Sequence, residues 1–156
     1  MRKIILFISL AFLVMQASSE NYKEYRAIFM DRQNLEKSVF YTETNRDLKN
    51  PGKIYHKYPY LFVNEKYKGI HVIDNTDPKK PVKKGFISAP GCLDIVVKND
   101  IVYIDNSVDL VSFSLKENKV TKRIKNVFPE PAPPSGYYYG YYNRPDNYIL
   151  IGWEHR

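Results

Sequence analysis

Acidic residues at two turns are the first candidates for chemistry. Asp74, Asn75 and Asp77 could offer oxygen ligands to calcium, but the central glycine and terminal glutamate of a calcium loop are missing. Asp105 and Asp109 could form the carboxylate pair of a glycoside hydrolase. A glycoside hydrolase needs its two carboxyl groups about 5–10 Å apart, and any turn with two acidic residues would bring them to that distance. We therefore interpret both groups as turn residues and expect no catalytic residue and no metal ligand among them.

The histidines and the single cysteine give no stronger signal. His56, His71 and His155 stand apart, without the H-E-x-x-H or C-x-x-C spacing of a metal site. Cys92 is the only cysteine, so it forms no internal disulfide, and we expect a small, half-buried apolar residue. A reactive or intermolecular thiol is the alternative. With no G-x-S-x-G elbow and no glycine-rich phosphate loop, we expect no enzyme and no cofactor.

A proline- and tyrosine-rich segment, 129–147, is the best candidate for a binding surface. Prolines are too dense in its first half for a helix or a sheet interior. Tyrosine offers a large, stiff face with a polar tip, which suits protein contacts or the stacking of sugars. Packing of alternate tyrosines onto the protein's own sheet is the alternative. The candidate ligand-binding residues are Tyr137, Tyr138, Tyr139, Tyr141 and Tyr142.

Length and charge set the wider limits. The chain has 156 residues, 44% of them hydrophobic, and a formal net charge of +7. These values exclude a highly charged disordered chain and a polytopic membrane protein. Lysines gather around two turns, where they would protect exposed strand edges, and we expect no nucleic-acid partner. These basic residues are Lys79, Lys80, Lys83 and Lys84, then Lys116, Lys119, Lys122, Arg123 and Lys125.

The first 19 residues have the order of a secretory signal peptide. Arg2 and Lys3 precede an apolar run over 4–15, and small residues follow. The run is too short for a membrane-spanning helix, so we expect no transmembrane span in the mature chain. No cysteine lies near the cleavage point, which argues against a lipid anchor. We expect an exported protein that is periplasmic, bound to the cell envelope or secreted.

After the signal peptide, residue types favour a lead-in and then β-strands. The lead-in, 20–51, contains a short helix over 32–39 that Asp31 can cap. Short runs rich in branched and aromatic residues follow, separated by turn residues, and they predict an all-β fold. The expected strands are 54–56, 60–63, 70–73, 82–87, 95–97, 101–104, 110–115 and 120–124.

These strands form an internal repeat. Residues 54–57 align with 95–98, 60–64 with 101–105, 70–74 with 110–114 and 82–84 with 120–122. Each unit holds four strands in about 40 residues, the size of a propeller blade, and a two-fold β-sandwich is the alternative. We therefore divide the chain into repeat 1 at 52–91, repeat 2 at 92–128, and the start of a third repeat at 148–156.

Four segments resemble the LVIVD-repeat family of exported, β-propeller-like bacterial proteins. The segment 69–78 (Gly-Ile-His-Val-Ile-Asp-Asn-Thr-Asp-Pro) is similar to the core signature, and 110–115 (Leu-Val-Ser-Phe-Ser-Leu) is similar with serine in place of aspartate. Segments 30–39 and 126–131 resemble the flanking parts of Bacteroidetes members. Because a propeller needs four or more blades, the resemblance implies a truncated member, with a split reading frame or half of an assembly as the alternatives.

The motifs that carry the resemblance are structural, so they indicate a fold more specifically than they indicate an activity. We expect an exported, non-catalytic repeat module that binds a protein or a polysaccharide of the cell envelope, with self-association through open blade edges as a further option. The alternative is a fragment of a propeller-type extracytoplasmic hydrolase whose remaining blades are missing.

Overall fold

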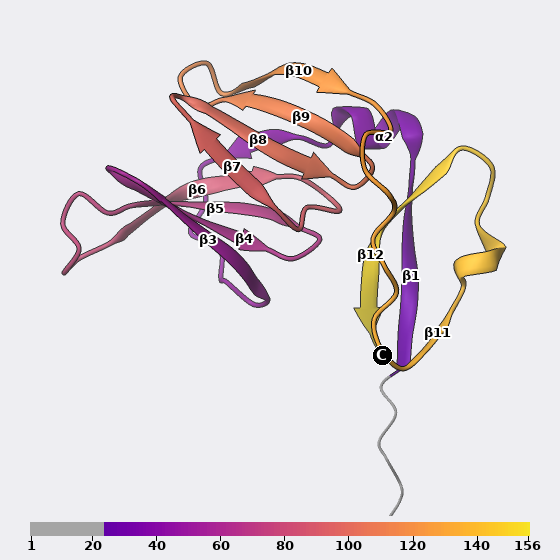
Figure 1. Cartoon of the computed structure of the whole chain (residues 1–156). Coiled ribbons are helices and arrows are strands. Elements are labelled where there is room, and N and C mark those ends of the chain that lie inside the picture. The colour runs from indigo at the N-terminus through magenta and orange to yellow at the C-terminus, as the bar shows by residue number, and fades with distance from the viewer. Residues whose placement is uncertain (1–23) are drawn as a thin grey trace, which may run out of the picture.

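The computed structural model describes residues 24–156, so the expected signal peptide lies outside the described residues. The expectation of an all-β fold is confirmed. In the part of the chain that the structure describes, the strands form three sheets, and each of them is open (Figure 1).

The first sheet is an antiparallel meander from repeat 1. A short strand from the lead-in joins it beside β6, giving the order β2-β6-β5-β4-β3. The sheet contains β2 (Phe40–Thr42), β3 (Pro51–Lys57), β4 (Tyr60–Glu65), β5 (Gly69–Asp74) and β6 (Val82–Ser88). The alternation of branched and aromatic residues had predicted all of these strands except β2.

The second sheet is an antiparallel meander of four strands, with the order β10-β9-β8-β7, from the segment that the sequence predicts as a second repeat. It contains β7 (Ile95–Lys98), β8 (Ile101–Asn106), β9 (Asp109–Ser114) and β10 (Lys119–Ile124). The two sheets share one hydrophobic core, to which the first contributes Phe62 and Ile70 and the second Val102 and Phe113, all fully buried. Burial of these apolar side chains is the main favourable contribution to folding.

The lead-in forms β1 (Glu24–Asp31) and then α2 (Arg32–Lys37). The Asp31 side chain accepts hydrogen bonds from the backbone N–H groups of Gln33 and Asn34, at 2.9 and 3.2 Å, and so caps the helix as expected. The helix ends two residues before the predicted 39, at Lys37. The sequence had not predicted β1.

The third sheet joins segments from both ends of the described chain. β12 (Tyr148–His155) pairs antiparallel with β1, and β11 (Tyr137–Tyr139) pairs parallel with the other edge of β1. The Ser107 hydroxyl donates to the Leu150 carbonyl at 2.5 Å and ties this sheet to the turn between β8 and β9. Gly152, with φ of 151°, lies against the Tyr67 ring, where a Cβ atom would come within 2.5 Å of it.

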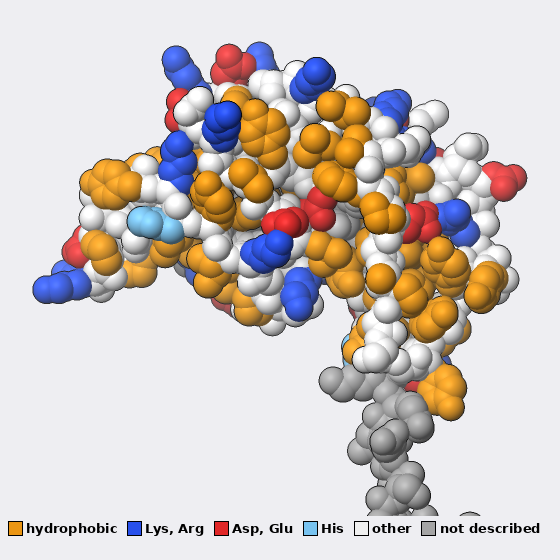
Figure 2. Space-filling model, viewed as in Figure 1, with side chains coloured by type: hydrophobic (Ala, Val, Ile, Leu, Met, Phe, Trp, Pro, Cys, Tyr) orange, Lys and Arg blue, Asp and Glu red, His pale blue; other side chains and the backbone are white. Residues whose placement is uncertain are grey.

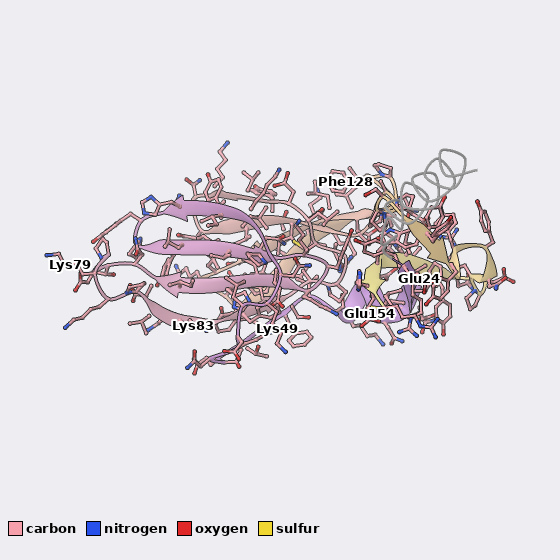
Figure 3. The ribbon with its side chains drawn as sticks, turned by 90° about the horizontal axis from the view of Figure 1, so that it is seen from below. Glu24, Lys49, Lys79, Lys83, Phe128 and Glu154 are labelled. Carbon is pink, nitrogen blue, oxygen red and sulfur yellow. The ribbon has the colours of Figure 1, made fainter. Side chains whose placement is uncertain are left out.

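Charged side chains lie at both ends of the molecule, on the first sheet and on the third sheet. Figure 3 shows Lys79 at the far tip of the first sheet, with Lys49 and Lys83 along one margin. Glu24 and Glu154 lie at the opposite end, on the third sheet. Of the basic residues expected at turns, Lys79 thus lies at a hairpin tip and Lys83 at a sheet margin.

Candidate binding surface

The second sheet exposes large apolar side chains on the face that points away from the first sheet. Along β7 and β8, inward residues such as Val97 and Val102 are buried, whereas Val96 is 53% exposed and Tyr103 is also exposed. Val96 and Tyr103 are cross-strand partners, and Leu110 on β9 is half-buried on the same face. Figure 2 shows hydrophobic side chains gathered over this part of the molecule. We call this surface the outer face of the second sheet.

A groove of about 500 Å³ lies between this face and the proline-rich segment that follows β10. We call residues 128–132 the strap. Apolar atoms dominate the lining of the groove. Its central side chains are Leu93, Val96, Tyr103, Leu110 and Phe128.

Contacts at both ends hold the strap in place. At its start, the Val127 and Phe128 N–H groups both donate to the Val108 carbonyl, at 2.7 and 3.0 Å. At its end, the Trp153 indole N–H donates to the Pro131 carbonyl at 3.2 Å. The Glu130 carboxylate between them accepts from the Tyr141 hydroxyl at 3.2 Å. The groove is therefore formed before any ligand binds, which lowers the entropy cost of binding.

Asp105 is the acidic group at the base of the groove. Its carboxylate accepts hydrogen bonds from the backbone N–H groups of Leu93 and Asp94, at 3.0 and 2.8 Å. Burial nevertheless raises the pKa of Asp105 above its ordinary value, because desolvation outweighs these hydrogen bonds. Asp105 thus holds the start of the β7 segment against β8.

Cys92 lies beside Asp105 and is fully buried, which agrees with a packing role more than with the alternative of a reactive thiol. Its sulfur accepts a hydrogen bond from the Asn64 amide at 3.1 Å. Burial raises the pKa of the Cys92 thiol well above its ordinary value, and the neighbouring Asp105 carboxylate adds to this effect. The thiol therefore stays protonated and weakly nucleophilic.

Of the five candidate tyrosines, three form β11 of the third sheet and two begin the short 3-10 helix η1 (Tyr141–Asn143), and none of the five lines the groove. Tyr141 stacks on Trp153 with ring centroids 5.8 Å apart, and Tyr138 meets Trp153 edge-on at 5.4 Å. Tyr139 lies under the Arg156 guanidinium. Tyr137 is exposed, and Tyr142 is 88% exposed. Two of the tyrosines thus pack onto their own domain, while ligand binding by the five stays a prediction.

The two acidic turns have structural roles in the described residues. The Asp74 carboxylate accepts from the Thr76 N–H and hydroxyl, which lowers the pKa of Asp74, and Asp77 accepts from the Lys79 N–H. These are the expected Asx-turn hydrogen bonds. Within 24–156, no three histidine, cysteine, aspartate or glutamate residues are grouped so that they could hold a metal ion.

Asp105 and Asp109 do not act as a pair. Strand alternation places Asp105 on the outer face with Tyr103, whereas Asp109 is fully buried on the inner side with Val111. Asp109 forms ion pairs with Arg32 at 2.9 Å and with Arg123 at 2.7 Å. Arg123 is therefore part of a buried ionic cluster and not of the basic turn surface on which the sequence had placed it.

Sequence reasoning missed the groove and the ionic cluster. The signal for the groove was the alternation along β7 and β8, where Val96 and Tyr103 are apolar at outward positions. Nothing local indicated that the strap would cross that face, because its contacts with Val108 and Trp153 are long-range.

Among residues 24–156, no helix is long and apolar enough to cross a membrane.

Comparison with known proteins gives no relative: no family model, no curated protein and no solved structure matches the chain. The resemblance to LVIVD-repeat proteins therefore stays a prediction from the sequence.

Proposed function

We propose that the chain is an exported, non-catalytic interaction module of propeller-like repeats that binds a protein surface through the outer face of its second sheet. The observation that carries this proposal is the preformed, apolar groove of about 500 Å³ between that face and the strap. Grooves of this size, lined by apolar and aromatic side chains with a few polar groups, are typical binding sites.

The chemistry of the groove favours an apolar protein surface over a sugar. Val96, Tyr103, Leu110 and Phe128 offer aromatic and branched side chains, which are the groups enriched at the centres of protein interfaces. Asp94 and Glu130 supply polar groups around them. A polysaccharide would need more hydrogen-bonding side chains than this lining provides.

The blade-like interpretation rests on two observations. Each sequence unit forms one four-stranded antiparallel meander, and the two meanders pack against each other through a shared core. This is the way in which successive blades of a propeller contact each other. Under this proposal the third sheet covers one end of the stacked pair, and the outer face of the second sheet is the surface left for a partner.

The test of the groove uses the dye 1-anilinonaphthalene-8-sulfonate, whose fluorescence rises on apolar protein surfaces. At about 1 µM protein we expect wild type to enhance the dye's fluorescence, and we expect Leu110→Gln to reduce this enhancement severalfold, since an uncharged amide in the groove disfavours an apolar ligand without attracting the sulfonate. Tyr142→Gln is the matched control, because Tyr142 is exposed and lies outside the groove.

Circular dichroism checks that each variant is folded. A folded wild type that leaves the dye's fluorescence unchanged would contradict the proposal. Equal loss of fluorescence in the Leu110 and Tyr142 variants would contradict it as well, because the dye would then report a surface other than the groove.

A further inference from the structure

The first and second sheets pack against each other face to face around one hydrophobic core. The first sheet meets the second with one face, on which Phe62, Ile70 and Val72 are buried. The second sheet contributes its inner face, on which Val102 and Phe113 are buried. This contact is the main interface inside the molecule.

The outer face of the second sheet repeats the docking face of the first. In the alignment of the two units, the exposed or half-buried apolar residues of the second sheet occupy the positions of buried or partly buried core residues of the first. The second sheet therefore presents outward the same kind of surface with which the first sheet docks. The matched pairs are Tyr55 with Val96, Phe62 with Tyr103 and Ile70 with Leu110.

The far face of the first sheet shows the reciprocal relation. Its outward residues occupy the positions that form the inner, docking face of the second sheet. Ile54 is 67% exposed, and Leu61 and Ile73 are half-buried. The matched pairs are Ile54 with Ile95, Leu61 with Val102 and Ile73 with Phe113.

Part of that far face is already covered by the chain itself. The Arg46 guanidinium lies 4.3 Å from the centre of the Phe86 ring, and the His71 ring nitrogen is 2.9 Å from the Glu65 carboxylate. This cluster closes the face beside Phe86 but does not include Ile54, Leu61 or Ile73. An apolar strip over β3, β4 and β5 remains for a partner.

We propose that the partner of the groove is a second copy of this chain, which stacks head-to-tail. The part of the outer face that the strap leaves open, around the exposed Val96 and Tyr103, docks on the far face of the first sheet of the next copy, in the same orientation as the contact between the two sheets. This inference rests on the proposed function, since it names the protein surface that the groove binds.

The structure favours association through faces and not through the open edges that the sequence suggested. Edge strand β10 carries the exposed Lys119 and Lys122, and edge strand β2 is only three residues long. Both features oppose pairing of strand edges. Because the two docking faces differ, the contact is heterologous and forms a ring or an open chain of copies.

The test is sedimentation equilibrium of the purified protein and two single variants. We expect wild type to associate as its concentration rises. Val96→Lys blocks one face and Ile54→Lys blocks the other, so each variant alone should associate at least about tenfold more weakly. A 1:1 mixture of the two variants should form a 1:1 complex, because each supplies the face that the other lacks. Tyr142→Lys is the control and should associate like wild type.

Both substituted side chains are more than half exposed, so we expect the variants to fold, and circular dichroism checks this. The proposal is overturned if wild type stays monomeric, if either variant associates like wild type, or if the mixture forms no 1:1 complex. Ile54 lies outside the groove, so Ile54→Lys should keep its dye fluorescence. A protein that binds the dye but stays monomeric would refute self-association and leave the proposed function standing.

Discussion

Asp105 shows how one residue can distinguish two similar units. The first unit has Asn64 at the matching position, and its amide donates to the Gly69 and Cys92 carbonyls, both at 3.3 Å. In the second unit the Asp105 carboxylate accepts backbone hydrogen bonds instead. The aligned position is therefore occupied once by a fully buried neutral amide and once by a half-buried acid that is costly to ionise.

The raised pKa of Asp105 predicts how stability changes with pH. Between the unfolded pKa, about 3.9, and the higher folded pKa, the folded state binds more protons, so this residue lowers stability as pH rises through that window. The Asp105→Asn variant has no carboxyl group at this position, so its stability does not fall in this way as pH rises. We therefore expect Asp105→Asn to have a higher free energy of unfolding relative to wild type at pH 7 than at pH 3.

Urea denaturation at the two pH values measures this difference. Glu154→Gln is the matched control, because it removes a carboxylate from an exposed site. A pH-independent effect of Asp105→Asn would contradict the assignment.

At the scale of elements, the tyrosine segment is held to the third sheet by Trp153, the single tryptophan of the chain. Tyr141 stacks on Trp153, and its hydroxyl reaches Glu130 of the strap. The segment thus links the third sheet to one wall of the groove. The five tyrosines are not equivalent, because Tyr142 is largely exposed.

Removing the stacked ring should therefore affect the indole, whereas removing the exposed ring should not. We expect Tyr141→Ala to shift the emission of Trp153 to longer wavelength and to lower the free energy of unfolding by about 1 kcal/mol. Tyr142→Ala, the matched control, should leave both unchanged. If the two variants gave equal emission shifts, the stacking arrangement would be wrong.

Local patterns predicted most elements but few of their neighbours. The strands β3 to β10 and the Asp31 cap were predictable, because alternation and capping are encoded within a few residues. The run Glu-Tyr-Arg-Ala-Ile-Phe-Met-Asp of β1 was not, since its partner β12 is more than 100 positions away in the chain. The groove could not be predicted for the same reason, because it depends on where the strap crosses the second sheet.

At the scale of the whole molecule, one buried carboxylate joins three parts of the chain. Asp109 on β9 binds Arg32 of α2 and Arg123 of β10, and it accepts the Asn126 N–H at 3.0 Å. Arg123 also donates to the Leu35 and Glu36 carbonyls at the end of α2. The cluster therefore fastens the lead-in to the second sheet and positions the chain that enters the strap.

Loss of this carboxylate leaves two partly buried guanidinium groups without their main partner. We expect Asp109→Ala to lower the free energy of unfolding by about 3–5 kcal/mol. Glu154→Ala is the matched control, because its ion pair with Arg26 has both side chains 58% exposed and should cost less than about 1 kcal/mol. Urea denaturation measures both, and similar losses in the two variants would refute the role of the cluster.

The pairing of β1 with β12 has a consequence for the order of folding. The two meanders consist of neighbouring strands joined by short turns, so they can form early in folding. β1 precedes both meanders in the chain, but its antiparallel partner is residues 148–155, which follow them. Closing such a long loop carries a larger entropy cost than forming a hairpin. The third sheet is thus the last to assemble, and until then β1 is an unpaired strand open to contact with other chains.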